Sequence, residues 1–102
     1  MNCNGCLPLT TLDVSANTSL HELDCRECAL TGLTLGLQED LWYLDSSDNA
    51  LTVLDLSGCS AALENLMCSG NALTALDLSA CPGLRTLDCW HGVTKSWTRL
   101  SG

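Results

Sequence analysis

Phenylalanine is absent from the 102-residue sequence, and the only aromatic residues are three tryptophans and one tyrosine. Leucine therefore has to supply most of the core of a chain that is 46% hydrophobic. This bias is unusual for an irregular globular domain and typical of repeat proteins, in which one residue type fills the same site many times. The length predicts a single domain.

Basic residues are also scarce. Four Lys and Arg stand against 12 Asp and Glu, which gives a net charge of −8. A surface of this charge repels phosphate backbones and anionic membranes, so we expect no nucleic-acid partner. A cationic partner is compatible with it.

Long apolar runs are missing as well. No run reaches the ~18 residues of a membrane span, so we expect no membrane insertion. Residues 1–14 lack a basic stretch followed by an apolar one, and we expect no export signal in the chain as given. Helices find no support, because Gly, Ser, Asp and Asn recur every few residues and favour turns.

What the sequence does contain is an internal repeat. Four segments, 21, 22 and 21 residues apart, begin at Leu20, Leu41, Leu63 and Leu84 and follow the pattern L-x-x-L-x-C/S-x-x-C/N-x-L, which the fourth loses at Gly92. A second half-pattern, L-x-x-L-x-L, begins at Leu30, Leu51 and Leu73.

The alternation within each repeat has a period of two, which indicates short strands. If about 21 residues close one coil, equivalent strands of successive coils stack at ~4.8 Å into a parallel sheet. We therefore predict a β-solenoid with strands on one face and short extended or turn segments on the other. The prediction depends on one inward column that contains Leu23, Leu44, Leu66 and Leu87.

The repeated Asn should turn inward and form hydrogen bonds with loop backbone, and Cys can fill the same site. Residues 36–40 break the pattern and predict an irregular bend.

The two half-patterns, LDCSxN-like and LTxLDLSxN-like, resemble the nested leucine-rich repeats of bacterial proteins over about residues 3–90. The resemblance implies about four coils with little or no regular helix, a concave face of strands that binds other proteins, and a bacterial cell-surface or secreted location. We predict a leucine-rich-repeat solenoid over residues 1–90 and a separate tail over residues 91–102.

The two ends of the chain depart from the repeat. The first coil has no cap, and its strand near residues 2–4 should be an open edge that allows self-association. In the tail, Val93, Trp97 and Leu100 can fold over the last coil as an improvised cap. The tail sequence HGVTKSWTRLS also resembles a translated interspersed repeat element of ruminant genomes, which implies a chimeric chain or a mispredicted reading frame.

The eight cysteines admit two interpretations. Cys3, Cys6, Cys25 and Cys28 have the spacing of a four-thiolate zinc site. The repeat predicts the same spacing, however, because Cys3, Cys25, Ser46, Cys68 and Cys89 share one inward column and Cys6, Cys28, Asn49 and Asn71 share another. Buried structural thiols are the favoured interpretation, and a metal site is the alternative. Cys59 and Cys81, equivalent to Asn17, are interpreted as turn residues without a redox role, since no helix N-terminus is predicted beside them.

Aspartates form two outward rows. Asp24, Asp45 and Asp88 share one row, interrupted by Met67, and a second row, interrupted by Thr34, contains Asp13, Asp55 and Asp77. Calcium needs six to eight oxygens at one point, whereas a row offers one per coil, so we interpret these residues as solvated turn formers.

The concave face is the candidate binding site. In the family register, its strands expose alternate residues: Glu22, Asp24, Arg26, Tyr43, Asp45, Ser47, Asn65, Met67, Ser69, Thr86, Asp88 and Trp90. Tyr43, Met67 and Trp90 are apolar anchors among acidic neighbours, which suits a protein or peptide with basic residues.

Catalysis has no support in the sequence. The only histidines, His21 and His91, lie about three coils apart, and there is no nucleophile elbow or phosphate-binding loop. We therefore predict a protein–protein interaction module that is not an enzyme and uses no cofactor. The alternatives are a metal-binding solenoid and a functionless fragment of a longer surface protein.

Overall fold

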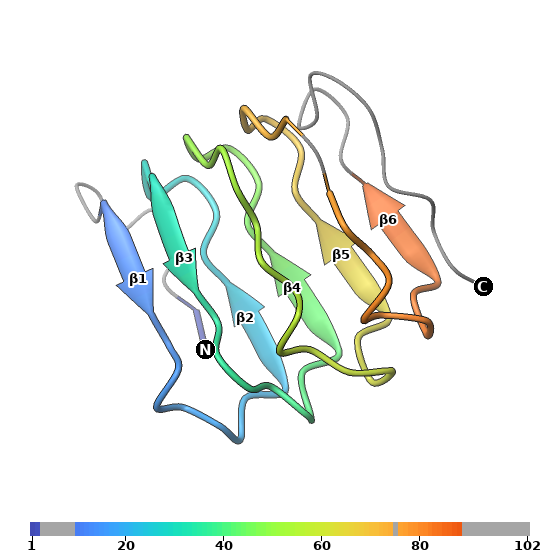
Figure 1. Ribbon diagram of the computed structural model, residues 1–102. Coiled ribbons are helices and arrows are strands. Elements are labelled where there is room, and N and C mark those ends of the chain that lie inside the picture. Colours follow the sequence, from blue (N-terminus) through green and yellow to red (C-terminus); the bar gives the residue numbers. More distant parts are fainter. Residues whose placement is uncertain (3–9, 75, 89–102) are drawn as a thin grey trace.

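The chain forms a parallel β-solenoid of about four coils in the computed structural model, which describes residues 1–2, 10–74 and 76–88 (Figure 1). Its strands have three residues each: β1 (Thr11–Asp13), β2 (Glu22–Asp24), β3 (Gly32–Thr34), β4 (Tyr43–Asp45), β5 (Asn65–Met67) and β6 (Thr86–Asp88). Every strand pair is parallel, so the predicted fold class is confirmed.

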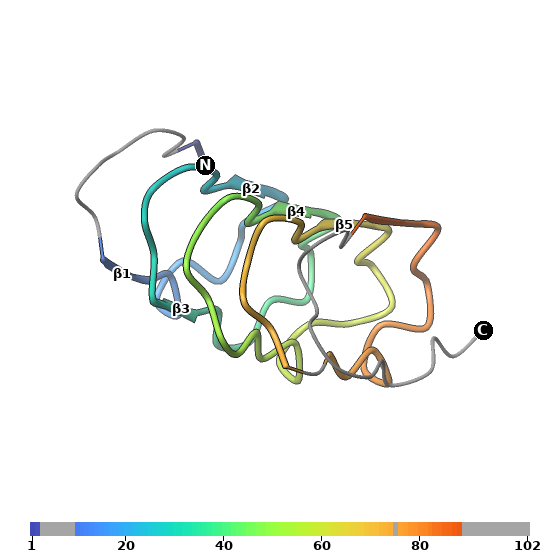
Figure 2. The same cartoon turned by 90° about the horizontal axis from the view of Figure 1, so that it is seen from above.

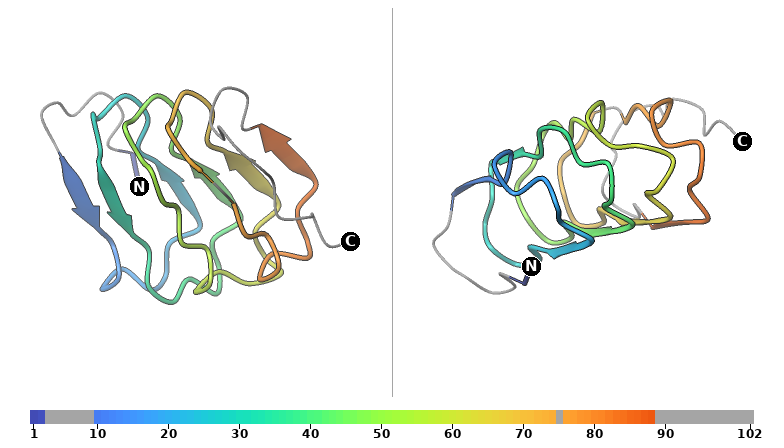
Figure 3. Two further views of the ribbon diagram at one scale, coloured as in Figure 1. Left: turned by 45° about the horizontal axis from the view of Figure 1, so that its top comes forward. Right: turned by 90° about the horizontal axis from the view of Figure 1, so that it is seen from below.

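The strands form two sheets on opposite sides of the coils. The larger sheet has the order β2-β4-β5-β6, and the smaller one pairs β1 with β3. Figures 2 and 3 show the chain winding from the larger sheet to the opposite side and back. The complete coils span residues 20–40, 41–62 and 63–83, and each places its residues above the equivalent ones of the coil before.

The interior is a stack of leucines. The pairing sets Leu23 beside Leu44, Leu44 beside Leu66 and Leu66 beside Leu87. The first three are fully buried and Leu87 packs against them. Fully burying one leucine stabilises the fold by roughly 1.5–3 kcal/mol, so the leucine columns are the main source of stability. The inward column predicted from the repeat is confirmed.

Asparagines hold the turns that follow the larger sheet. Asn49 Nδ2 donates to the carbonyls of Cys25 (2.9 Å) and Ser46 (3.0 Å), and its Oδ1 accepts from the N–H groups of Cys28 and Leu30. Asn71 repeats this arrangement one coil later. These bonds satisfy turn backbone that the ladders leave unpaired, as the inward Asn position predicts.

The opposite side differs in part from the prediction. Strands were expected on one face only, but β1 and β3 form a second parallel pair there. That pair does not continue, because residues 53–56 and 76–78 are not strands. A groove of about 330 Å³, lined by Leu33, Gly36, Asp55 and Gly58 among others, lies where the next pair would form.

The bend at residues 36–40 is present and well anchored. Gly36 adopts a left-handed conformation (φ 65°), and Gln38 is buried beyond it. The Gln38 N–H donates to the Gly58 carbonyl at 2.8 Å, so backbone contacts join the two coils at the bend.

Residues 1–2, 10–74 and 76–88 contain no helix. That part of the chain therefore offers no candidate for a membrane-spanning helix. Met1 and Asn2 lie beside β2, where Met1 O accepts from the Asp24 N–H at 2.9 Å and Asn2 forms a bridge with Asp24.

Candidate functional site

The strand face, which is the outward surface of β2, β4, β5, β6 and the residues just after them, contains the predicted binding residues. Their register is confirmed in two rows, which are Glu22, Tyr43, Asn65 and Thr86 in one and Asp24, Asp45, Met67 and Asp88 in the other. Arg26, Ser47 and Ser69 follow the strand ends. Trp90 lies outside the described residues.

Arg26 is the polar centre of the strand face. Its Nε lies 3.0 Å from Asp24 Oδ1 and its second terminal nitrogen donates to Asp24 Oδ2 at 3.0 Å. The same Nε lies 3.4 Å from Asp45 Oδ2, in the next coil. The register places the two carboxylates side by side, and the guanidinium between them reduces their repulsion.

These contacts shift the pKa values of the cluster. The hydrogen bond from Arg26 lowers the pKa of Asp24, and the same bond raises the pKa of Arg26. The pKa of Tyr43 is raised, first by burial and then by the negative charges of Asp45 and Asp24. Asp24 is therefore ionised and Tyr43 neutral at neutral pH.

Two predicted surface residues are less accessible than the alternation implies. Asp45 is 5% exposed and Ser47 is 7% exposed. Arg26 reaches Asp45 from the neighbouring coil, and Ser69 Oγ donates to Ser47 Oγ at 3.3 Å. The Ser47 N–H also donates to Asp45 Oδ1 at 3.0 Å. The expectation that both project freely outward is therefore wrong, and the two residues form the floor of the site.

The apolar part of the strand face centres on Tyr43 and Met67. Both are half-buried, and they are diagonal neighbours, because Tyr43 pairs with Asn65 and Met67 with Asp45. Trp42 enlarges this area: its ring meets that of Tyr43 edge to face, with centroids 5.9 Å apart, and it is 39% exposed.

Sequence reasoning missed the contribution of Trp42. It belongs to a row one position before the strands, in which backbone hydrogen bonds join His21, Trp42, Glu64 and Arg85 in turn. The repeat pattern assigns only the inward leucines on either side of this position, so it indicates no role for the row. A tryptophan directly before a strand-face tyrosine was the available signal.

The cysteine columns are only partly as expected. Cys25 and Cys28 are fully buried thiols, which donate to the carbonyls of Asp45 (3.6 Å) and Arg26 (3.2 Å). The interpretation as a thiol is wrong for Cys68, which is in a disulfide bond. The inward columns bring cysteines of successive coils within about one sheet spacing, and such proximity permits a disulfide.

The four-thiolate metal set cannot be assembled from the described residues, because Cys3 and Cys6 lie outside them. Within the described ranges, no three His, Cys, Asp or Glu side chains are grouped to hold a metal ion. His91, one of the two histidines, also lies outside the described part of the chain.

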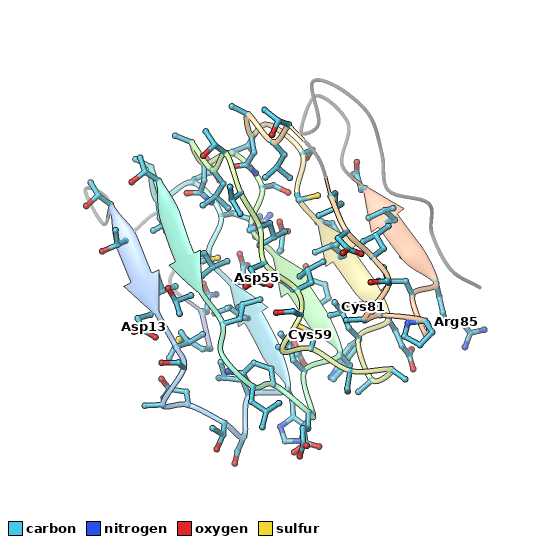
Figure 4. All side chains as sticks on the ribbon, viewed as in Figure 1. Asp13, Asp55, Cys59, Cys81 and Arg85 are labelled. Carbon is cyan, nitrogen blue, oxygen red and sulfur yellow. The ribbon has the colours of Figure 1, made fainter. Side chains whose placement is uncertain are left out.

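The second aspartate row lies on the opposite side, where Figure 4 shows Asp13 and Asp55. Asp13, Asp55 and Asp77 each accept a 2.9 Å hydrogen bond from the N–H group of the serine two residues later. All three are exposed, and the serine hydrogen bonds lower their pKa values. These are the contacts of solvated, turn-forming aspartates.

No protein-family model, curated protein or solved structure matches this chain.

Proposed function

We propose that the chain is a leucine-rich-repeat module that binds a protein or peptide on its strand face and catalyses no reaction. The observation that supports this most directly is the contiguous apolar area of Trp42, Tyr43 and Met67 on an otherwise polar sheet surface. Partly exposed aromatic and methionine side chains with a polar rim are typical of the centres of protein interfaces.

The charges around this area favour a basic partner. Glu22, Asp24, Asp45 and Asp88 contribute four carboxylates, and the guanidinium of Arg26 offsets part of their charge. The overall charge of −8 has the same sign, so a cationic segment is steered to the strand face over a long range. Four short strands offer a small surface, and we expect modest affinity.

The floor of the site gives it a fixed shape. Arg26 connects β2 to β4, and the Ser69–Ser47 hydrogen bond connects the next two turns. These contacts hold the polar groups in place before a partner arrives, which lowers the entropy cost of binding.

Selection of peptides from a random display library on the immobilised chain tests this proposal. Selected peptides should be rich in Arg or Lys and should bind more weakly as salt is raised. Tyr43→Asp and Met67→Asp should each weaken binding by about 10-fold or more.

Val53→Asp is the matched control, because Val53 is a 68% exposed aliphatic residue outside the strand face. It should leave affinity unchanged. A site elsewhere is indicated if Val53→Asp weakens binding as much as Tyr43→Asp. Failure to select any binder of the folded chain also contradicts the proposal.

A further inference from the structure

Two buried cysteines meet across adjacent coils on the side opposite the strand face. The Cys59 N–H donates to the Leu56 carbonyl at 2.9 Å, and the Cys81 N–H donates to the Leu78 carbonyl at 3.0 Å. Both therefore occupy the same turn in successive coils, and Figure 4 shows them next to each other. Both are reduced core residues, Cys59 being 8% exposed and Cys81 fully buried.

The two coils have few other connections in this region. On the strand side, β4 and β5 are joined by a ladder. On the opposite side, among the described residues, no backbone hydrogen bond joins residues 53–59 to residues 76–81. A groove of about 90 Å³, lined by Ser57, Ser79 and Ala80 among others, separates the coils there. A covalent link at this point would hold coils that the backbone leaves unjoined.

We infer that Cys59 and Cys81 form a reversible disulfide bond on exposure to a peroxide, and that this bond staples coil 41–62 to coil 63–83. Equivalent residues of adjacent parallel coils are spaced at about 4.8 Å. This spacing lies within the Cα–Cα range of roughly 4.4–6.8 Å that a disulfide requires. The link therefore needs little backbone movement.

The chemistry needs only these two thiols and hydrogen peroxide. The hydrogen bond from the Cys59 thiol raises the pKa of Cys59 and lowers that of Cys81, so Cys81 is the first to ionise. The Cys81 thiolate attacks one peroxide oxygen, hydroxide leaves, and a sulfenic acid forms. Cys59 sulfur then attacks Cys81 sulfur, and the sulfenic OH takes the Cys59 proton and leaves as water. The hydroxide from the first step is neutralised by the proton that Cys81 released on ionising. Two thiols are oxidised and one peroxide is reduced.

Cys25 and Cys28 differ from this pair in what the following coil places beside them. Each donates its thiol to a backbone carbonyl, and the next coil has Ser46 and Asn49 at the equivalent positions. Neither of them meets a cysteine in that coil. The sequence indicated turn residues without a redox role at positions 59 and 81, and the structure adds the contact between the two thiols.

Peptide mapping of the intact protein, treated with hydrogen peroxide and then alkylated, tests the inference. Cleavage before Asp55 and Asp77, after Glu64 and after Arg85 releases residues 55–64 and 77–85 as separate peptides, with Cys68 on another. We expect these two peptides to be joined, two hydrogen atoms lighter than their sum, and to separate on reduction. The melting temperature should rise by about 10 °C, because the bond closes a loop of about 20 residues.

Cys59→Ser should abolish both the joined peptide and the rise in melting temperature. Cys25→Ser is the matched control, because Ser46 occupies the same column naturally, and it should preserve both effects. Sulfinic or sulfonic acid at Cys59 or Cys81 without the joined peptide would overturn the inference. So would recovery of both thiols unmodified, or cross-links from either one to a different cysteine.

Discussion

Gln38 Nε2 donates hydrogen bonds to the carbonyl of Val14, 24 residues earlier, at 3.2 Å, and to that of Leu35 at 2.8 Å. Asn49 makes the same two kinds of contact at another turn of the solenoid, one to the previous coil and one within its own coil. Gln38 is fully buried. The coils are therefore pinned by side-chain amides at two different turns, although only one of the turns has the repeated asparagine.

Replacement of Gln38 by methionine should lower the free energy of unfolding by about 2 kcal/mol. Methionine has a similar shape but no donor, so the Leu35 carbonyl is left without the Nε2 bond in a buried site. The loss is partly offset because Gln38 Oε1, which has no hydrogen-bond partner, is removed as well. Urea unfolding followed by circular dichroism measures the change.

Glu39→Ala tests an exposed residue directly beside Gln38 and should change the stability by less than about 0.5 kcal/mol. If Gln38→Met also changes the free energy of unfolding by less than about 0.5 kcal/mol, the bend tolerates substitution and the Gln38 amide does not anchor it.

The sequence predicted the features that repetition fixes. The period of 21 or 22 residues set the parallel register of the four-stranded sheet, and the leucine spacing set its buried column. The Asn49 and Asn71 bonds also followed from the repeat, because equivalent positions in stacked coils meet equivalent backbone.

The sequence did not predict what single side chains do once the coils are stacked. Gln38 appears in only one coil, so no pattern indicates that its longer side chain reaches the position that Asn fills elsewhere. Arg26 likewise has no basic counterpart at the equivalent positions of the next two coils, Ser47 and Ser69, and its contact with Asp45 depends on side-chain reach. The paired strands β1 and β3 were missed because their leucine pattern is the same as that of the unpaired segments after them.

Arg26→Met should raise the pKa of Asp24. In the native protein the Arg26 hydrogen bond is the largest cause of the lowered value. Without it, Asp24 faces the Asp45 carboxylate with the more weakly acting Met1 amino group as the remaining positive charge, and repulsion between like charges favours the protonated form. Chemical shifts of the Asp24 carboxyl carbon, followed from pH 7 to acid, report the change.

Arg85→Met removes one exposed guanidinium from the other end of the sheet and should leave the Asp24 titration in place. If Arg26→Met and Arg85→Met move that titration equally, overall charge controls Asp24 and the local hydrogen bond does not.

Acid should destabilise the solenoid through its turn-forming aspartates. Hydrogen bonds from the following serines lower the folded-state pKa values of Asp13, Asp55 and Asp77 below the ordinary 3.8. The unfolded chain therefore binds more protons than the folded chain below about pH 5, and stability falls with pH. The contribution is complete above the unfolded pKa and is lost as pH drops through the folded values.

Melting temperatures measured between pH 6 and pH 2 check this direction. Ser57→Ala should move the loss contributed by Asp55 to higher pH, because the serine side chain is the first cause of its lowered pKa. A triple Asp13, Asp55 and Asp77 to Asn variant should lose stability less steeply in acid. The charge-matched control replaces Glu27, Glu39 and Glu64 by Gln, and an equally flattened profile there would contradict a local origin.

Gly58 should be the least replaceable glycine among those described outside the left-handed region. A Cβ built at Gly58 overlaps the carbonyl oxygen of Gly36 in the preceding coil, which is backbone and cannot rotate away. The two coils also approach closely enough here for the Gln38 N–H to donate to the Gly58 carbonyl at 2.8 Å. The coils therefore cannot separate at this point without losing that hydrogen bond. Gly58→Ala should therefore lower the free energy of unfolding by about 2 kcal/mol or more.

Gly32→Ala separates this steric effect from the general effect of adding a methyl group. A Cβ at Gly32 lies 3.6 Å from Thr11 Cγ2, which is ordinary van der Waals contact. Loss of unfolded-state entropy should make this variant about 0.5 kcal/mol more stable. Urea unfolding measures the change in the free energy of unfolding for each variant. The two changes should have opposite signs if the steric overlap at Gly58 is responsible. If Gly58→Ala is as stable as Gly32→Ala, the two coils do not approach at Gly36 and Gly58 as closely as the structure places them.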